Sequence, residues 1–87
     1  MIFYFTPKSE KQFEKLNRNA QRSICLLVRK LETTENPLLL GKLLKGNLKE
    51  FWRFRAGDYR LICKIENNAI ICLYVGNRQN IYKDFNI

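Results

Sequence analysis

The most informative feature of this chain is a pair of short segments, of which the first is Phe51-Trp-Arg-Phe-Arg-Ala-Gly-Asp-Tyr-Arg60. Successive side chains of a β-strand point to opposite faces, so this stretch places Trp52 and Phe54 on one face of a strand. Arg53 and Arg55 then fall on the other face, with their Cα atoms about 6.6–7 Å apart. The alternation predicts a strand with an apolar core side and a basic solvent side.

A second segment, Gly76-Asn-Arg-Gln-Asn-Ile-Tyr82, adds to the basic side. A tight turn at Ala56-Gly57-Asp58 reverses the chain after the first strand and delivers Arg60 onto the next one. Arg78 and Tyr82 then complete a set of guanidiniums and one phenol on a single surface, in a chain without histidine. We expect a surface that binds a phosphodiester and is able to cut it.

The composition is that of one small domain, 1–87, with a strong excess of positive charge. Sixteen basic and eight acidic residues give a net charge of +8, and 46% hydrophobic residues suffice for a single core. Residues 1–41 hold seven basic and four acidic residues, and residues 42–87 hold nine basic and four acidic ones. The excess favours a polyanionic partner such as nucleic acid, a ribonucleoprotein, an anionic membrane or an acidic protein. The alternative is a basic surface that serves solubility alone.

The cysteines and the apolar runs narrow the class of protein. Cys25, Cys63 and Cys72 show no paired spacing, and without histidine a zinc site is disfavoured. We expect reduced cysteines in the core of a cytoplasmic protein, with a Cys63–Cys72 cross-strand disulfide as the alternative. The longest apolar run, Ala69 to Val75, is too short to span a membrane, and the N-terminus lacks the pattern of a signal peptide. The sequence therefore predicts a soluble protein with no membrane partner.

The first half of the chain predicts one strand and two helices. Ile2–Phe5 is short and aromatic, and Thr6-Pro7 is typical of a helix start with threonine as the N-cap. This helix runs to about Leu16, and Asn19 is the expected cap of a second helix, which Asn36-Pro37 ends. The apolar residues of the second helix recur at i, i+3, i+4 and i+7: Ile24, Leu27, Val28 and Leu31.

The second half predicts three strands after an irregular connector at 38–48. The leucines expected to anchor this connector to the core are Leu43, Leu44 and Leu48. Strands are expected at about 50–55, 58–66 and 69–75, with a two-residue turn at Asn67-Asn68, because asparagine tolerates positive φ. The order β-α-α-β-β-β predicts an α+β fold in which two helices pack on one face of a small, mostly antiparallel sheet. The other face is left for function.

The basic surface suits RNA cleavage without a metal or a cofactor. No carboxylate cluster is present in the sequence to hold magnesium, so metal-dependent nuclease chemistry is disfavoured. In metal-free cleavage the ribose 2′-hydroxyl attacks the neighbouring phosphorus, and guanidiniums stabilise the charge of the transition state. Tyr82 is the candidate base, with a packing or stacking role as its alternative. A simpler interpretation of the basic surface is solvated charge, with Arg60 paired to Asp58 or Glu50.

These segments resemble the RelE-type toxins of bacterial type II toxin–antitoxin systems, within the RelE/ParE superfamily. The similarity covers nearly the whole chain and includes the connector Gly41-Lys-Leu-Leu-Lys-Gly46, the hairpin W-R-F-R-x-G-D-Y-R and the ending V-G-N-R-x-x-I-Y. The hairpin and the ending are the specific part. The resemblance implies a RelE-like fold whose catalytic residues are Arg53, Arg55, Arg60, Arg78 and Tyr82.

The resemblance also implies an activity and partners. RelE-type toxins enter the ribosomal A site and cleave the mRNA there, which arrests translation, and a cognate antitoxin neutralises them. We therefore expect a ribosome-dependent mRNA endonuclease with an acidic antitoxin encoded nearby. Many relatives carry histidine where this chain has Asn77, so an acid–base role of that histidine is absent. Further RNA contacts are expected from Lys42, Lys45, Lys49, Lys64, Asn77 and Lys83.

Two other functions stay open. A ParE-like inhibitor of DNA gyrase shares this fold, but a protein-binding poison has no need of Arg78 and Tyr82 together. A basic RNA- or protein-binding module that has lost activity is supported only by Asn77. The sequence favours the nuclease over both.

Overall fold

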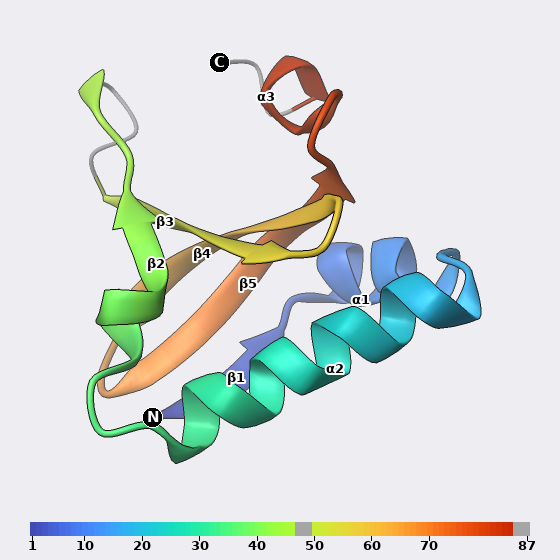
Figure 1. The fold of residues 1–87 in the computed structure, drawn as a ribbon. Coiled ribbons are helices and arrows are strands. Elements are labelled where there is room, and N and C mark those ends of the chain that lie inside the picture. The colour runs from blue at the N-terminus through green and yellow to red at the C-terminus, as the bar shows by residue number, and fades with distance from the viewer. Residues whose placement is uncertain (47–49, 85–87) are drawn as a thin grey trace.

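Within the part of the chain that the structure describes, five strands form one sheet and two helices cover one of its faces (Figure 1). This computed structural model describes residues 1–46 and 50–84, apart from the side chains of Tyr82 and Asp84. In chain order the elements are β1 (Ile2–Phe5), α1 (Pro7–Glu14), α2 (Arg18–Thr33), the 3₁₀ turn η1 (Pro37–Leu40), β2 (Gly41–Leu43), β3 (Phe51–Ala56), β4 (Tyr59–Glu66), β5 (Ala69–Asn77) and α3 (Ile81–Asp84).

The sheet is mostly antiparallel, with strand order β1-β5-β4-β3-β2. Only the β1–β5 pair among the described strands is parallel. Figure 1 shows α1 and α2 beneath the sheet and the short α3 on the opposite side. The predicted α+β class, with two helices on one face of a mostly antiparallel sheet, is confirmed.

Helix α1 begins where Thr6-Pro7 predicts. Thr6 Oγ1 accepts a hydrogen bond from the Ser9 N–H (3.2 Å), and the Thr6 N–H donates to Ser9 Oγ (2.9 Å), which completes a capping box. Ser9 is fully buried, and its hydroxyl donates to the backbone oxygen of Cys72 in β5 at 2.8 Å. One side chain therefore both starts the helix and docks it on the sheet. The helix ends at Glu14, slightly earlier than predicted.

Helix α2 begins two residues earlier than predicted. The N-cap is Asn17, whose Oδ1 accepts a hydrogen bond from the Ala20 N–H at 2.9 Å, and the helix starts at Arg18. The choice of Asn19 was wrong because that residue lies inside the first turn, where it is helical rather than extended like a cap.

Among the described residues, no helix is long and apolar enough to cross a membrane.

The predicted connector is more regular than expected, since it contains η1 and the edge strand β2. Leu43 was expected to anchor it to the core but is 46% exposed. The reason is that β2 has a neighbouring strand on one side only, so its side chains are poorly covered. Leu44 is half-buried and its N–H donates to the Phe51 oxygen at 2.9 Å. The predicted anchor Leu48 lies outside the described residues.

The three long strands begin and end within two residues of the predicted positions. Asn67 and Asn68 have φ of 48° and 63°, as the predicted two-residue turn requires. Gly57 opens the β3–β4 turn with φ of 61°. In the β4–β5 pair the register shifts once, because Ile62 pairs with Tyr74 whereas Cys63 pairs with Cys72. This irregularity is a β-bulge on β5.

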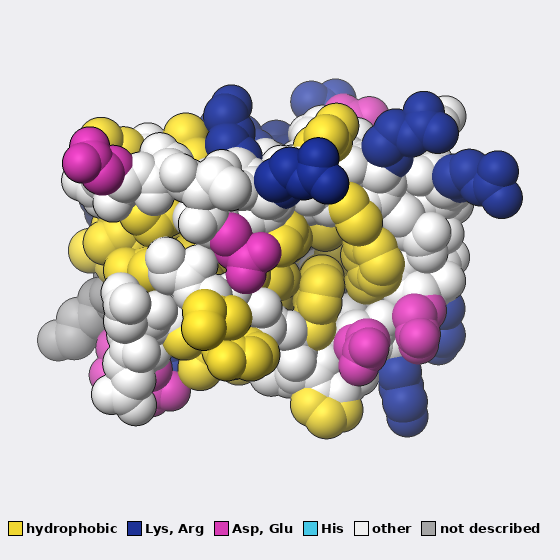
Figure 2. Space-filling model, turned by 90° about the horizontal axis from the view of Figure 1, so that it is seen from below, with side chains coloured by type: hydrophobic (Ala, Val, Ile, Leu, Met, Phe, Trp, Pro, Cys, Tyr) yellow, Lys and Arg dark blue, Asp and Glu magenta, His cyan; other side chains and the backbone are white. Residues whose placement is uncertain are grey.

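The core lies between the sheet and α2. Ile24 and Leu31 of α2 are fully buried against a cluster that includes Phe54 and Leu61. Leu27 and Val28 are half-buried against the same cluster, so the predicted inward face of the helix is confirmed. Apolar side chains gather in the centre of the helix side of the molecule and are visible there from outside (Figure 2).

One cysteine departs from the prediction. Cys63 and Cys72 are fully buried cross-strand partners, but Cys25 is exposed. The placement of Cys25 in the core was wrong because it follows the buried Ile24 directly, which turns it about 100° around the helix. Burial, together with a hydrogen bond to Cys72, raises the pKa of the Cys63 thiol well above its ordinary value.

We predict that Gly41→Ala lowers the free energy of unfolding by about 1–3 kcal/mol, because a β-carbon there overpacks the core. An added Cβ would lie 2.5 Å from Cε1 of the fully buried Phe54 ring. Chemical denaturation measures the change, with Lys42→Ala, an exposed neighbour on the same strand, as the control. Wild-type stability of Gly41→Ala would show that the Phe54 ring does not pack against Gly41.

We predict that Cys25 alone reacts when the native protein meets a thiol-alkylating reagent at pH 8. Cys63 and Cys72 are shielded, and the raised pKa keeps the Cys63 thiol protonated. Folding raises the pKa of Cys63 above the unfolded value of about 8.5. The free energy of unfolding is therefore unaffected by this thiol below that pH, and it falls as the pH rises from there through the folded pKa. Peptide mass spectrometry with and without denaturant measures the labelling. Fast native labelling of Cys63 or Cys72 would contradict this burial.

Candidate functional site

The register of β3 and β4 places three arginines on the sheet face opposite the helices. Arg55 pairs directly with Arg60, and Arg53 pairs with Ile62. Their neighbour Phe54 is fully buried on the helix side, so the arginines point the other way. Cross-strand partners have Cα atoms about 4.5–5.5 Å apart, which brings two guanidiniums within reach of one phosphate. The surface formed by Arg53, Arg55 and Arg60 is called the arginine face below.

Two of the predicted lysines extend the arginine face. Lys42 of β2 pairs with Arg53 and is exposed. Lys64 of β4 pairs with Phe51, two residues along from Arg53, and forms an ion pair with Glu66 (Nζ to Oε2, 3.5 Å). The sheet therefore carries a basic row from its edge strand toward its middle. Lys45 and Lys83 are exposed outside the strands, and Lys49 lies outside the described residues.

Arg60 is held over the β3–β4 turn. Its Nη1 donates hydrogen bonds to the backbone oxygens of Gly57 and Tyr59, both at 2.9 Å. These bonds engage one nitrogen of a guanidinium that carries five N–H donors. They hold the Arg60 guanidinium at the β3–β4 turn before any ligand binds.

Arg78 lies at the same turn. Its backbone N–H donates to the Asp58 oxygen at 2.7 Å, and its Nε lies 3.7 Å from Asp58 Oδ1. Both side chains are largely exposed, so the ion pair is weak and a phosphate is able to replace the carboxylate. The structure thus brings the late arginine to the turn that joins Arg55 to Arg60.

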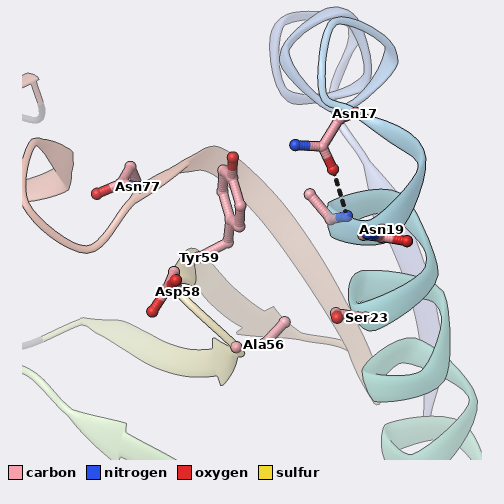
Figure 3. A pocket seen from close by; sticks show the side chains of 9 residues that line it. Asn17, Asn19, Ser23, Ala56, Asp58, Tyr59 and Asn77 are labelled. Atoms are coloured by element: carbon pink, nitrogen blue, oxygen red, sulfur yellow. Dashed lines mark hydrogen bonds between the residues drawn. The ribbon is translucent and has the colours of Figure 1, made fainter.

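Asn77 lies on the other face of the sheet from Arg53, Arg55 and Arg60. It pairs with Tyr59 and lines a hollow of about 340 Å³ between the start of α2 and the β3–β4 turn. Figure 3 shows the N-cap Asn17 and, from α2, Asn19 and Ser23 across this hollow from Tyr59. Asn77 Oδ1 accepts a hydrogen bond from the Gln79 N–H at 2.8 Å, which shapes the chain after β5. Since the neighbouring Gly76 pairs with Arg60 and side chains alternate along a strand, Asn77 lies on the face of β5 opposite to the arginine face.

Tyr82 belongs to α3, and its side chain is outside the described part of the structure. The preceding Ile81 is fully buried, and its Cδ1 would lie 2.9 Å from a Cβ added to Gly76. Gly76 pairs with Arg60, so α3 is anchored beside the arginine face. The predicted catalytic role of Tyr82 stays a prediction.

Sequence patterns missed two residues next to the arginine face. Tyr74 pairs with Ile62 and so lies on that face. Lys8 of α1 places its Nζ over the Tyr74 ring, 5.5 Å from the centroid. Strand alternation from Gly76 back along β5 could have found Tyr74. No local signal identifies Lys8, because its position depends on how α1 docks against β5.

The two faces of the molecule differ in charge. Acidic and basic side chains are mixed on the helix side (Figure 2), whereas the arginine face carries a row of cations on neighbouring strands. Across residues 1–46 and 50–84, no three His, Cys, Asp or Glu side chains come together to form a possible metal site. The arginine face is built from guanidiniums on two neighbouring strands.

The fold of this chain is shared by solved structures of toxin–antitoxin complexes. Similar solved structures include the RelBE2 toxin–antitoxin complex of Mycobacterium tuberculosis, with 24% identity, 87% of this chain and 88% of that chain covered, and a TM-score of 0.75. The RelB–RelE complex of Methanococcus jannaschii has 20% identity, 94% and 98% coverage and a TM-score of 0.72. The YoeB–YefM complex of Staphylococcus aureus has 20% identity, 84% and 91% coverage and a TM-score of 0.68. At these identities the likeness concerns the fold.

The amino-acid sequence matches one protein family over most of its length. The family described as "ParE toxin of type II toxin-antitoxin system, parDE" matches residues 3–82, and the chain belongs to it. No curated protein sequence matches the chain. The predicted membership in the RelE/ParE superfamily of type II toxins is therefore confirmed.

We predict that Arg53→Gln/Arg55→Gln weakens binding to single-stranded poly(U) more than Lys11→Gln/Lys15→Gln does. Both double variants remove two charges, but the two lysines are exposed on the α1 side. Loss of two phosphate contacts reduces the slope of log K against log salt by about 1.4. Fluorescence anisotropy measures the slope, and thermal unfolding checks each variant. Equal effects of the two pairs would mean that total charge matters and the arginine face does not.

Proposed function

We propose that this protein is a ribosome-dependent mRNA endonuclease, the toxin that cleaves mRNA in the ribosomal A site and so arrests translation. The observation that carries the proposal is the direct pairing of Arg55 with Arg60, with Arg53 beside them and Arg78 at the same turn. Several guanidiniums around one position provide the charge that a phosphoryl transition state needs. The ribosome presents the mRNA, so a compact basic face suffices.

The proposed reaction needs no metal or cofactor. The 2′-oxygen of the ribose bonds to the adjacent phosphorus while the bond from phosphorus to the 5′-oxygen breaks. The 2′-hydroxyl proton passes to a base, a proton is delivered to the leaving 5′-oxygen, and the products are a 2′,3′-cyclic phosphate and a 5′-hydroxyl. Arg55 and Arg60 bind the non-bridging oxygens, and Arg78 adds charge once Asp58 releases it. Tyr82 is the proposed base.

We also propose a cognate antitoxin as partner. The similar structures from Mycobacterium tuberculosis and Methanococcus jannaschii are toxin–antitoxin complexes. A net charge of +8 on 87 residues favours an acidic partner, because opposite charges steer association and neutralise the basic face. A small acidic protein encoded beside this chain would support the pairing.

A second candidate is an inhibitor of DNA gyrase, since the family that matches the chain is described as the ParE toxin. Fold alone does not separate the two activities, because one fold supports different functions. The clustered arginines favour the nuclease. An inactive RNA- or protein-binding module is the third candidate.

We predict that induction of the protein in a bacterium arrests translation and creates new in-frame mRNA 5′ ends. Arg78→Ala abolishes both effects, because the transition state loses a charge, and Tyr82→Phe weakens them, because the phenol oxygen is lost. Lys15→Ala, an exposed change on the α1 side, is the control and keeps full activity. With purified components, naked RNA is cut little and added ribosomes produce clear cutting.

Other outcomes would decide against this function. Intact mRNA with gyrase-dependent DNA damage would support the second candidate. Normal growth of the bacterium after induction would leave the inactive RNA- or protein-binding module as the remaining candidate. Efficient cleavage in the absence of ribosomes would overturn the ribosome dependence while retaining the nuclease.

A further inference from the structure

The contact between Lys8 and Tyr74 adds a cation at the far side of the arginine face. The Lys8 ammonium lies 5.5 Å from the centroid of the Tyr74 ring, a cation–π distance. Lys8 is exposed and Tyr74 is half-buried. The interaction therefore fixes the position of a charge that stays accessible to a ligand.

Helix α1 is fastened to β5 on both sides of Tyr74. Ser9 Oγ donates to the Cys72 oxygen at 2.8 Å, and Gln12 Oε1 accepts from the Val75 N–H at 2.8 Å. Both bonds link side chains of α1 to backbone atoms of β5. Lys8 belongs to the same helix, so its position above Tyr74 follows from rigid anchors.

Tyr74 is itself held in one orientation on the arginine face. An added Cβ on Gly76 would lie 2.9 Å from Tyr74 Cε1 and 2.9 Å from Ile81 Cδ1. The ring therefore lies close over the Gly76 backbone, and Gly76 is the strand partner of Arg60. Only glycine leaves room for this packing, which directs the ring along the face.

Strand β5 contains no lysine or arginine, although β2, β3 and β4 each place a basic residue on this face. Lys8 supplies the cation that β5 lacks. Adjacent strands are about 4.8 Å apart, so Tyr74 on β5 lies roughly 10 Å from Arg53 on β3. A single strand of RNA that crosses the arginine face would meet Lys8 after it passes Arg60.

We propose that Lys8 binds a backbone phosphate that flanks the scissile one in single-stranded RNA, with Tyr74 as its positioning residue. The inference rests on the proposed nuclease function and adds a subsite to it. The ammonium of Lys8 contacts the phosphate, and the Tyr74 ring keeps that ammonium over β5.

The test measures binding of an uncleavable 2′-O-methyl RNA octamer to the purified protein by fluorescence anisotropy at several salt concentrations. Lys8→Met retains the apolar stem and removes the charge, so we expect weaker binding and a salt slope reduced by about 0.7, the value for one phosphate on a single strand. Lys11 is an exposed lysine on the same helix, and we expect Lys11→Met to leave the affinity and the salt slope unchanged.

The role of Tyr74 is tested by rescue. Tyr74→Phe keeps the aromatic ring, so we expect it to bind the octamer with wild-type affinity. Tyr74→Leu removes the ring, so we expect the weaker binding and the smaller salt slope of Lys8→Met. In the ribosome reaction Lys8→Met raises KM and leaves kcat unchanged. An unchanged salt slope for Lys8→Met would overturn the subsite, even if the wild type cleaves mRNA. Failure of the wild type to cleave mRNA in the ribosome reaction would instead count against the proposed function, and failure of the wild type to bind the octamer would overturn the subsite as a binding site of its own.

Discussion

The packing of the Phe54 ring against Gly41 fixes the direction of every side chain in β3. The ring is fully buried and leaves no space for a Cβ at position 41. Because side chains alternate along a strand, Arg53 and Arg55 must then point away from the helices. The two-residue turn at Gly57 sets the register to β4 and places Arg60 opposite Arg55. A slip of one residue would bury the arginines and expose Phe54, so core and site depend on one constraint.

The structural features that the sequence predicted depend on local signals. The hairpin alternation, the Thr6-Pro7 helix start and the Asn67-Asn68 turn each involve residues within a few positions of one another. Their backbone preferences agree with the final fold, so tertiary contacts did not override them. The same holds for the arginines of β3 and β4, whose shared face follows from a period of two and a tight turn.

Tertiary contacts explain the features that the sequence did not reveal. Asparagine is an equally good cap at positions 17 and 19, so residue type alone does not show that the helix begins after Asn17. Strand β2 is three residues long and exists through its pairing with β3. The pairing of Asn77 with Tyr59 turns it away from the arginine face, and Lys8 reaches Tyr74 through the docking of α1 on β5. Such placements depend on residues far apart in the chain.

The central claim is that the arginine face, rather than the helix side, meets the RNA. It is tested most directly by the structure of the protein on a ribosome whose A-site mRNA carries a 2′-O-methyl group that blocks cleavage. The account predicts that the guanidiniums of Arg55, Arg60 and Arg78 lie within hydrogen-bond distance of the phosphate to be cut. An mRNA that contacts α2, or a sheet face turned away from the mRNA, would contradict it.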